Sequence, residues 1–151
     1  MPAPEAQPLH TLRLVRVFQA PRERVWRAWT DPGQMKHWFG PRGFTTPSIE
    51  LDLRPGGRYR IAMQPPEGGV FHLNGVFREV VPPERLVYTF QWEKAGWDYP
   101  ETLVTAEFRE RDGATELVLT HERFPEEKMR DDHGGGWSSC LERFAEFLGK
   151  A

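Results

Sequence analysis

The stretch that decides the fold is PEEKMRDDHGGGWSSCLERFAEFLGK, residues 125–150. Pro125 followed by two glutamates is a helix-start signal, because proline suits the first helical position and acidic side chains complement the helix dipole. Farther along, apolar side chains recur at steps of four, three and four residues, at Trp137, Leu141, Phe144 and Leu148. This spacing predicts a long C-terminal helix with one buried face.

Three consecutive glycines, Gly134 to Gly136, lie inside this helical pattern. Each costs about 1 kcal/mol relative to alanine in a helix interior. One interpretation is that the run breaks the helix, which separates a short first helix over about 125–132 from the main one. The other is that the missing side chains let the helix approach a cavity or a strand closely, with Trp137 as the plug.

Upstream of the helix, most of the chain alternates apolar and polar residues as strands do. A first strand over 11–19 is followed by two short helices, 21–30 and 32–38, with Asp31 as the N-cap of the second. Six further strands are predicted, separated by turn signals such as Asp112-Gly113, over residues 44–53, 58–64, 70–80, 85–92, 102–109 and 115–123. Successive hairpins predict an antiparallel sheet with one covered face.

The expected fold class is therefore α+β, with a curved antiparallel sheet of about six or seven strands wrapped around the long C-terminal helix. Residues 1–10 are expected to form a flexible tail, because their prolines follow no pattern, and residues 11–151 a single domain. Gly75 interrupts one strand and indicates a bulge or a close backbone approach.

Composition excludes several classes of function. The net charge of −2 supplies no general attraction to nucleic acid or to an anionic membrane. The single cysteine, Cys140, excludes an internal disulfide and any multi-cysteine metal site, and is expected to be a small packing residue. We find neither a signal-peptide pattern nor an apolar run of membrane-spanning length, so a cytoplasmic protein without membrane insertion is expected.

Aromatic residues make up 13% of the chain, with six tryptophans and ten phenylalanines, more than a minimal core of this size needs. One helix against a strongly curved sheet would leave interior volume on the concave side, where many aromatic side chains converge. A ligand cavity is the favoured expectation, and a collapsed aromatic core is the alternative.

Several motifs resemble the heat-shock-protein-90 ATPase activator-like branch of the START-like (SRPBCC) superfamily. They are VFQAPRERVWRAWTDP at 17–32, WFGP at 38–41, DLRPGG at 52–57, Gly75, PPERL at 82–86, LTHE at 119–122 and Gly136-Trp137. The resemblance covers nearly the whole chain from Thr11. It implies a helix-grip (START/Bet v-like) fold, in which the sheet wraps the last helix and encloses a hydrophobic pocket.

The resemblance also implies a range of activities. Members of the superfamily bind lipids, sterols, polyketides or plant hormones, some are cyclases or aromatases, and the namesake co-chaperones activate the chaperone ATPase. Those co-chaperones carry a separate N-terminal domain that docks the chaperone, and 151 residues leave no room for it beside the predicted domain. Chaperone activation is therefore not the favoured expectation.

Candidate ligand-binding residues are those whose apolar or polar-tipped side chains are expected on the concave face: Trp38, Phe39, Tyr59, Met63, Tyr88, Phe90, Phe108, His121, Trp137 and Leu141. The hydroxyls of Tyr59 and Tyr88 would anchor an otherwise apolar ligand. His121 has inward parity and is the candidate for a polar group that orients a ligand or acts as a general base, but a hydrogen-bonded core histidine is the favoured interpretation.

No metal or cofactor is expected. The sequence contains no zinc, phosphate-loop or nucleophile-elbow motif. Asp131, Asp132 and His133 are interpreted as a solvated helix end, because adjacent residues on a helix point in different directions.

Three functional hypotheses follow. The first is a module that binds a hydrophobic small molecule in its cavity without covalent chemistry. The second is a cyclase-like or aromatase-like enzyme that uses His121. The third is a protein-interaction module, co-chaperone-like or homodimeric, with an exposed apolar patch. The chain would act as a monomer or a homodimer.

Overall fold

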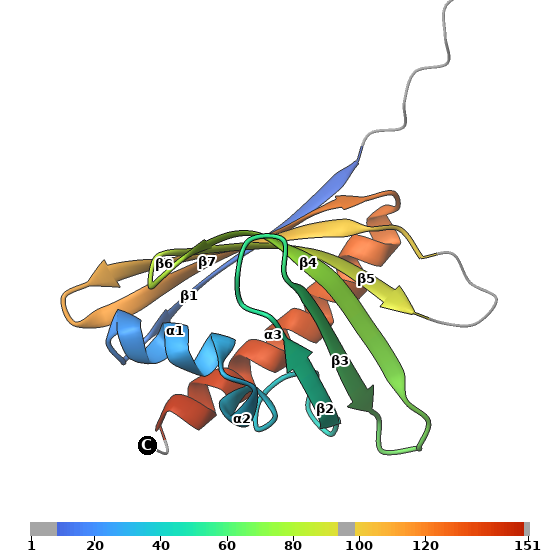
Figure 1. The fold of residues 1–151 in the computed structure, drawn as a ribbon, viewed down its shortest axis with the longest axis horizontal. Helices are drawn as coiled ribbons and strands as arrows, with labels where there is room; N and C mark the ends of the chain where they lie inside the picture. The colour runs from blue at the N-terminus through green and yellow to red at the C-terminus, as the bar shows by residue number, and fades with distance from the viewer. Residues whose placement is uncertain (1–8, 94–98, 150–151) are drawn as a thin grey trace, which may run out of the picture.

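Residues 9–93 and 99–149 are described in a computed structural model of the chain (Figure 1). The elements in order are β1 His10–Phe18, α1 Arg22–Thr30, α2 Pro32–Met35, β2 Thr45–Leu51, β3 Arg58–Gln64, β4 Phe71–Val81, β5 Arg85–Glu93, β6 Thr102–Arg111, β7 Ala114–Phe124 and α3 Glu127–Gly149. The sheet bends over α3, and α1 and α2 lie on the same side of the sheet as α3 (Figure 1).

The strands within the described ranges form one antiparallel sheet in the order β1-β7-β6-β5-β4-β3-β2. The first two strands of the chain therefore lie at opposite edges, because α1 and α2 carry the chain from one edge to the other. Asp112 and Gly113 form the two-residue turn between β6 and β7 with positive φ angles of 51° and 85°. The predicted fold class is confirmed: a curved antiparallel sheet around a long C-terminal helix, with two short helices after the first strand.

The two halves of α3 have different surroundings. In the C-terminal half, the ring of Phe144 lies 5.3 Å from Trp29 of α1 and 4.5 Å from Trp38, which follows α2. Trp38 is fully buried and its indole nitrogen donates to the carbonyl oxygen of Ala28. The short helices and the segment after α2 therefore pack against this half of α3.

Of the two interpretations of the glycine run, the break is wrong, because α3 continues through Gly134, Gly135 and Gly136. A Cβ atom on Gly134 would lie 3.3 Å from Cδ1 of Leu12 on β1, closer than most side-chain contacts. Close packing against a strand is the second interpretation of the run. The absence of side chains here lets α3 reach the sheet without losing its helical hydrogen bonds.

Two smaller boundaries also differ from the sequence expectation. β1 begins at His10, inside the predicted tail over 1–10, whose first eight residues lie outside the described part of the chain. The second short helix ends at Met35 rather than at residue 38. Its N-cap is as expected, since the Asp31 carboxylate accepts from the backbone N–H of Gly33 at 3.2 Å.

Gly75 in β4 is the site of a close backbone approach. A Cβ atom at this position would overlap the carbonyl oxygen of Thr89 and lie 2.6 Å from Cε1 of Tyr59. The pairing of β4 with β5 also shifts register between Phe77 and Glu79. Both features bend this part of the sheet, and that curvature lets β3 to β5 arch away from α3.

A matched pair of glycine substitutions tests these two assignments. Gly75→Ala is expected to lower the free energy of unfolding by about 2 kcal/mol or more, because its methyl group has no room. Gly135→Ala is expected to raise it by about 1 kcal/mol, because that helical position has open space around it. Urea denaturation of both variants measures the difference, and equal effects would contradict the assigned geometry.

Candidate ligand-binding cavity

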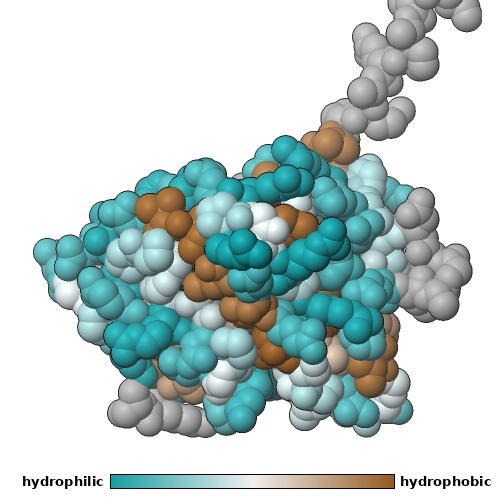
Figure 2. Space-filling view, in the orientation of Figure 1, coloured by the Kyte–Doolittle hydropathy of each residue, from teal (hydrophilic) through white to brown (hydrophobic). Residues whose placement is uncertain are grey.

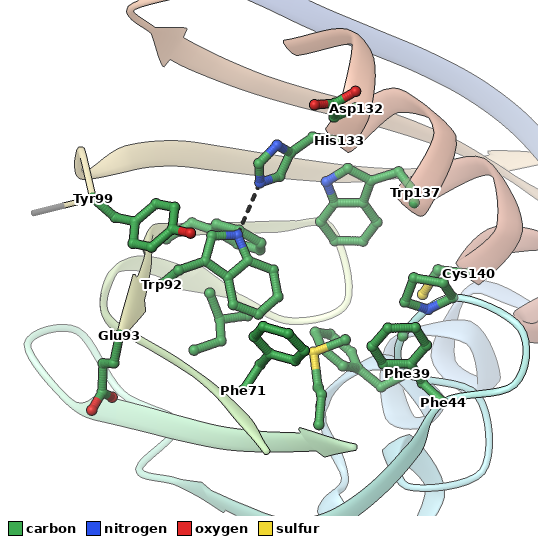
Figure 3. Close-up of a pocket in the computed structure, with 16 residues that line it drawn as sticks. Phe39, Phe44, Phe71, Trp92, Glu93, Tyr99, Asp132, His133, Trp137 and Cys140 are labelled. Carbon is green, nitrogen blue, oxygen red and sulfur yellow. Dashed lines mark hydrogen bonds between the residues drawn. The ribbon is translucent and has the colours of Figure 1, made fainter. Parts of the chain in front are cut away.

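A cavity of about 340 Å³ lies between the N-terminal half of α3 and the bent part of the sheet (Figure 3). The loop after α2 closes one side of it. The lining residues are Phe39, Gly40, Pro41, Phe44, Met63, Phe71, Leu73, Phe90, Trp92, Glu93, Tyr99, Asp132, His133, Gly136, Trp137 and Cys140. Most of this surface is aromatic or aliphatic, so the cavity is an apolar compartment with a few polar groups.

Strand register determines which sheet residues reach the cavity. Met63 of β3 is paired with Phe71 of β4, and Leu73 of β4 is paired with Trp92 of β5. Alternate residues of a strand face the same side, so the side chains of both pairs lie on the concave face. The inward-facing residues of β3, β4 and β5 thus form one continuous apolar wall of the cavity.

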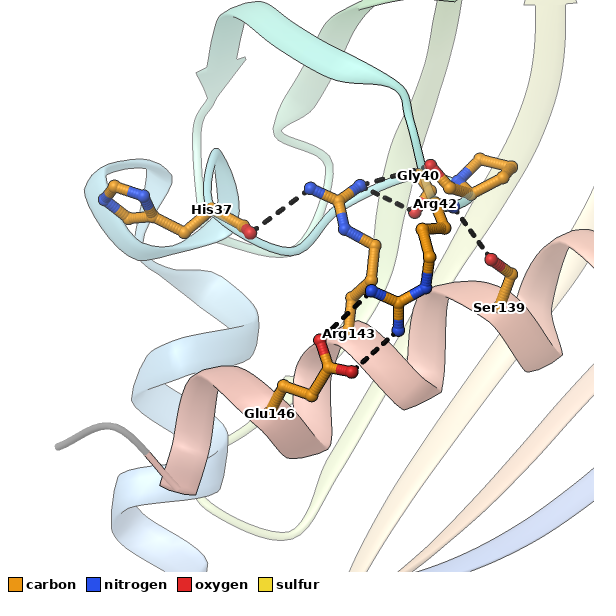
Figure 4. Close-up of polar contacts among 7 residues, drawn as sticks. His37, Gly40, Arg42, Ser139, Arg143 and Glu146 are labelled. Carbon is orange, nitrogen blue, oxygen red and sulfur yellow. Dashed lines mark hydrogen bonds and ion pairs between the residues drawn. The ribbon is translucent and has the colours of Figure 1, made fainter.

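The loop wall is held by Arg143 of α3. Its guanidinium donates to the carbonyl oxygens of Gly40 and His37 at 3.0 and 3.3 Å (Figure 4). It also donates to those of Phe39 and Pro41 at 3.3 and 3.2 Å. Three of these four residues line the cavity. Arg143 therefore supplies donors to a loop whose carbonyl groups are not paired in a sheet, and it fixes the position of this wall.

Arg42 ties the same loop to α3 from outside. Its backbone N–H donates to Oγ of Ser139 at 2.8 Å, and its guanidinium pairs with Glu146 at 2.8 Å (Figure 4). Both side chains of this ion pair are more than half exposed, so solvent screening leaves it a small contribution to stability.

At the opposite end of the cavity, Trp92 of β5 reaches across to His133 of α3 (Figure 3). The indole N–H donates to Nε2 of His133 at 2.9 Å, and Nδ1 of His133 lies 2.8 Å from the carbonyl oxygen of Met129. Because an indole nitrogen can only donate, Nε2 carries the lone pair and Nδ1 carries the proton. Burial lowers the pKa of His133, against smaller opposing effects of the Met129 carbonyl and of Asp132.

His121 of β7 is fully buried behind Trp137. The indole N–H of Trp137 donates to Nδ1 of His121 at 3.0 Å, so the imidazole proton is on Nε2, which donates to Oγ1 of Thr102 at 2.7 Å. The Thr102 hydroxyl in turn donates to the carbonyl oxygen of Phe90 at 2.8 Å. Burial lowers the pKa of His121 to about 2, with a smaller contribution from His133.

The sequence-predicted site residues fall into three groups. Phe39, Met63, Phe90 and Trp137 line the cavity. Tyr59 and Tyr88 line a smaller neighbouring cavity of about 30 Å³, to which Phe39 also contributes. Four others are buried in the core and are not among the residues that line either cavity: Trp38, Phe108, His121 and Leu141.

The hydroxyl of Tyr59 is already committed to the fold, because it donates to the carbonyl oxygen of Thr89. Burial raises the pKa of both Tyr59 and Tyr88, so both phenols are neutral near pH 7. Burial also raises the pKa of Cys140 to about 12, and its Sγ lies 3.7 Å from the carbonyl oxygen of Trp38. Cys140 is therefore a packing thiol at the cavity wall, not a reactive thiolate.

Sequence reasoning missed the residues of the cavity mouth. Trp92 shares the inward parity of Tyr88 and Phe90, which was the available signal. His133 was interpreted as part of a solvated helix end, although the helical spacing of four residues places it above Trp137. Phe44 and Phe71 lie just beside predicted turns, where a side chain's direction is not fixed by alternation.

Comparison with known proteins identifies the family. A profile of the family described as Activator of Hsp90 ATPase homolog 1-like protein matches residues 19–149. The chain belongs to this family. No curated protein sequence matches it.

Solved structures of the same fold come from several bacteria. A protein of Chromobacterium violaceum is 31% identical and superposes with a TM-score of 0.83, over 90% of this chain and 94% of that one. The AHSA1 protein of Silicibacter pomeroyi is 28% identical with a TM-score of 0.84, over 93% and 98%. A protein of Nitrosomonas europaea is 29% identical with a TM-score of 0.81, over 93% and 94%. These similarities extend across the sheet and α3 alike.

Two further properties concern only the residues that the structure describes. Among them, no three His, Cys, Asp or Glu side chains are grouped so that they could hold a metal ion. No helix in those ranges has the length and apolar character to cross a membrane.

The buried neutral state of His121 predicts a pH dependence of stability. Its folded-state pKa lies far below the ordinary value of 6.5, so the unfolded chain takes up the proton first as pH falls. Relative to a His121→Gln variant, the wild-type free energy of unfolding should fall by about 1.4 kcal/mol per pH unit below pH 6. Urea denaturation at a series of pH values measures this, and a constant difference would contradict a buried neutral His121.

Removal of the Arg143 guanidinium should loosen the loop wall. Arg143→Met is expected to lower the free energy of unfolding by about 2 kcal/mol, because several carbonyl groups lose a charged donor. Amide hydrogen exchange in residues 37–44 should accelerate at the same time. Arg42→Met is the matched control and should cost less than about 1 kcal/mol, because its ion pair is exposed. Equal costs for the two variants would show that Arg143 does not hold the loop.

Proposed function

We propose that the protein binds a small apolar or aromatic molecule in the cavity beneath α3, as a cytoplasmic module without covalent chemistry. The observation that carries this proposal is the cavity itself, about 340 Å³ of space bounded mainly by apolar side chains. Cavities that hold small molecules in proteins span about 300–1,000 Å³ and are lined mainly by apolar groups. A ligand that removes its apolar surface from water here gains about 25 cal/mol for each Å² buried.

Family membership supports the same proposal. The helix-grip fold of this family suggests ligand binding, and the pocket lies where this fold encloses one, between the sheet and the last helix. Binding is favoured over a cyclase-like reaction because both ring nitrogens of His121 are engaged in hydrogen bonds. A general base needs a free lone pair within reach of its substrate.

An interaction module is less well supported by the surface. The large exposed apolar side chains of the described residues are Leu9, Val15, Val17, Val70, Phe71 and Val81. Leu9, Val15 and Val17 lie in or beside β1, whereas Val70, Phe71 and Val81 lie in or beside β4. Three strands separate β1 from β4 in the sheet, so the two groups do not form one patch. On the face seen in Figure 2, apolar side chains form a narrow band bordered by polar ones rather than a broad patch.

Neighbouring glycines of α3 offer a direct test of the cavity. Gly136 lines it, whereas Gly135 is exposed with open space around its Cβ position. Gly136→Leu should place a side chain in the cavity and weaken the binding of methylnaphthalene about tenfold or more. Gly135→Leu should leave binding unchanged, although both substitutions favour the helix by about 0.8 kcal/mol. Equilibrium dialysis measures both affinities.

Similar affinities in the two leucine variants would place the ligand elsewhere. Native mass spectrometry of the purified wild type, followed by denaturing extraction, gives an independent readout. An apolar molecule that co-purifies with the wild type and with Gly135→Leu, but not with Gly136→Leu, would identify the ligand class. Failure of the wild type to bind methylnaphthalene or naphthol, with nothing extracted, would contradict the proposed function.

A further inference from the structure

The polar groups of the cavity are arranged unevenly. Glu93 is drawn outward, where its carboxylate accepts from Arg60 at 3.1 Å and from Asn74 at 3.0 Å (Figure 3). Asp132 pairs with Lys128 at 3.0 Å on the exposed side of α3. The cavity wall among the described residues includes no lysine or arginine. A carboxylate or phosphate group in the cavity would thus find no cationic side chain on its wall.

Trp92 and His133 present a donor and an acceptor to each other at the mouth of this apolar space. The Trp92 indole provides an N–H, and His133 provides the Nε2 lone pair, because its proton is engaged with the Met129 carbonyl. Both side chains are partly exposed, and Trp92 is the penultimate residue of β5. A rotation of the indole separates the two nitrogens without disturbing the centre of the sheet.

Separation of this pair has a cost that only some ligands can offset. A donor or acceptor left without a partner away from water costs about 1–3 kcal/mol. A hydroxyl group can accept from Trp92 and donate to His133 at the same time, so it replaces one hydrogen bond by two. An ether, a carbonyl or a carboxylate can only accept and leaves Nε2 of His133 unpaired, whereas a hydrocarbon satisfies neither nitrogen.

We propose that the cavity selects neutral hydroxylated aromatic molecules, whose hydroxyl lies between Nε1 of Trp92 and Nε2 of His133 while the ring occupies the apolar space. This inference rests on the proposed function and adds the chemistry of the ligand to it. Trp92 and His133 are the residues that determine specificity, and Phe90, Met63 and Trp137 provide the apolar contact.

A series of naphthalenes substituted at the same ring position tests the proposal at neutral pH. Naphthol carries the hydroxyl, methylnaphthalene matches its size without polarity, methoxynaphthalene is acceptor-only and naphthoate is anionic. Equilibrium dialysis gives each affinity for the wild type and for the Trp92→Phe, His133→Phe and doubly substituted proteins. For each protein we compare the affinity for naphthol with that for methylnaphthalene. This ratio isolates the contribution of the hydroxyl, because both ligands place the same apolar ring in the cavity.

The ratio is expected to fall about tenfold in the double variant, which leaves the hydroxyl without a partner, and by less in each single variant, which leaves it one partner. Methoxynaphthalene should lose no affinity in His133→Phe, and naphthoate should bind the wild type most weakly. Circular dichroism establishes that the variants fold, and the methoxynaphthalene affinity of His133→Phe is a second readout that needs only one substitution.

The possible failures are distinguishable. If the wild type binds methylnaphthalene and naphthol but the ratio is the same in all four proteins, the assigned hydroxyl site is overturned and the binding function stands. Binding of naphthoate as tight as that of naphthol would also overturn it. If no member of the series binds the wild type, the proposed function itself fails.

Discussion

The buried indole N–H of Trp137 needs an acceptor inside the protein, and much of the structure is arranged around the one it has. His121 accepts from it, donates to Thr102, and Thr102 donates to the carbonyl oxygen of Phe90. One chain of hydrogen bonds thereby joins α3 to β7, β6 and β5. Removal of any member would leave a buried polar group unpaired, which costs about 1–3 kcal/mol. This chain of hydrogen bonds therefore fixes the distance between α3 and the sheet at Trp137.

The cavity arises because α3 carries large side chains on the C-terminal side of Trp137 and glycines on its N-terminal side. Toward the C-terminus, Phe144 and Leu148 are buried, and Phe144 packs against aromatic residues of α1 and of the segment after α2. Toward the N-terminus, the glycine run presents backbone rather than side chains to its surroundings. The sheet arches away there because β4 approaches β5 closely at Gly75 and shifts register beside it. Bulky packing at one end and missing side chains at the other leave the space open.

Local patterns in the sequence predicted most of the fold. The helical period of residues 137–148, the alternation of the strands and the Asp112-Gly113 turn each depend on neighbouring residues, so a single sequence is enough to recognise them. Continuity of α3 through Gly134 was not predictable in this way, because it depends on contact with Leu12 more than a hundred residues away. Helical propensity alone left a break open as one of two interpretations, and tertiary packing decides against it.

The candidate site was predicted only in part, for a related reason. Alternation indicated that Phe90 and His121 face inward, and the helical period indicated the same for Trp137, but neither pattern tells how deeply a side chain is buried. Phe108 and Leu141 also have the expected inward parity, yet they are packed into the core, and Phe108 lies against Trp26 and Trp29 of α1. The mouth, where Trp92 and His133 meet, is made by two elements whose distance is set by the curvature of the whole sheet.

The aromatic core also gives the protein an optical property. Trp29 lies 5.0 Å from Trp38 and stacks on Trp137 at 6.0 Å, so three indoles are close enough to share excitation energy. Of these three, Trp137 alone borders the cavity. Light absorbed deep in the core can thus reach the cavity wall, which makes the intrinsic emission of the folded protein sensitive to what occupies the space beside Trp137.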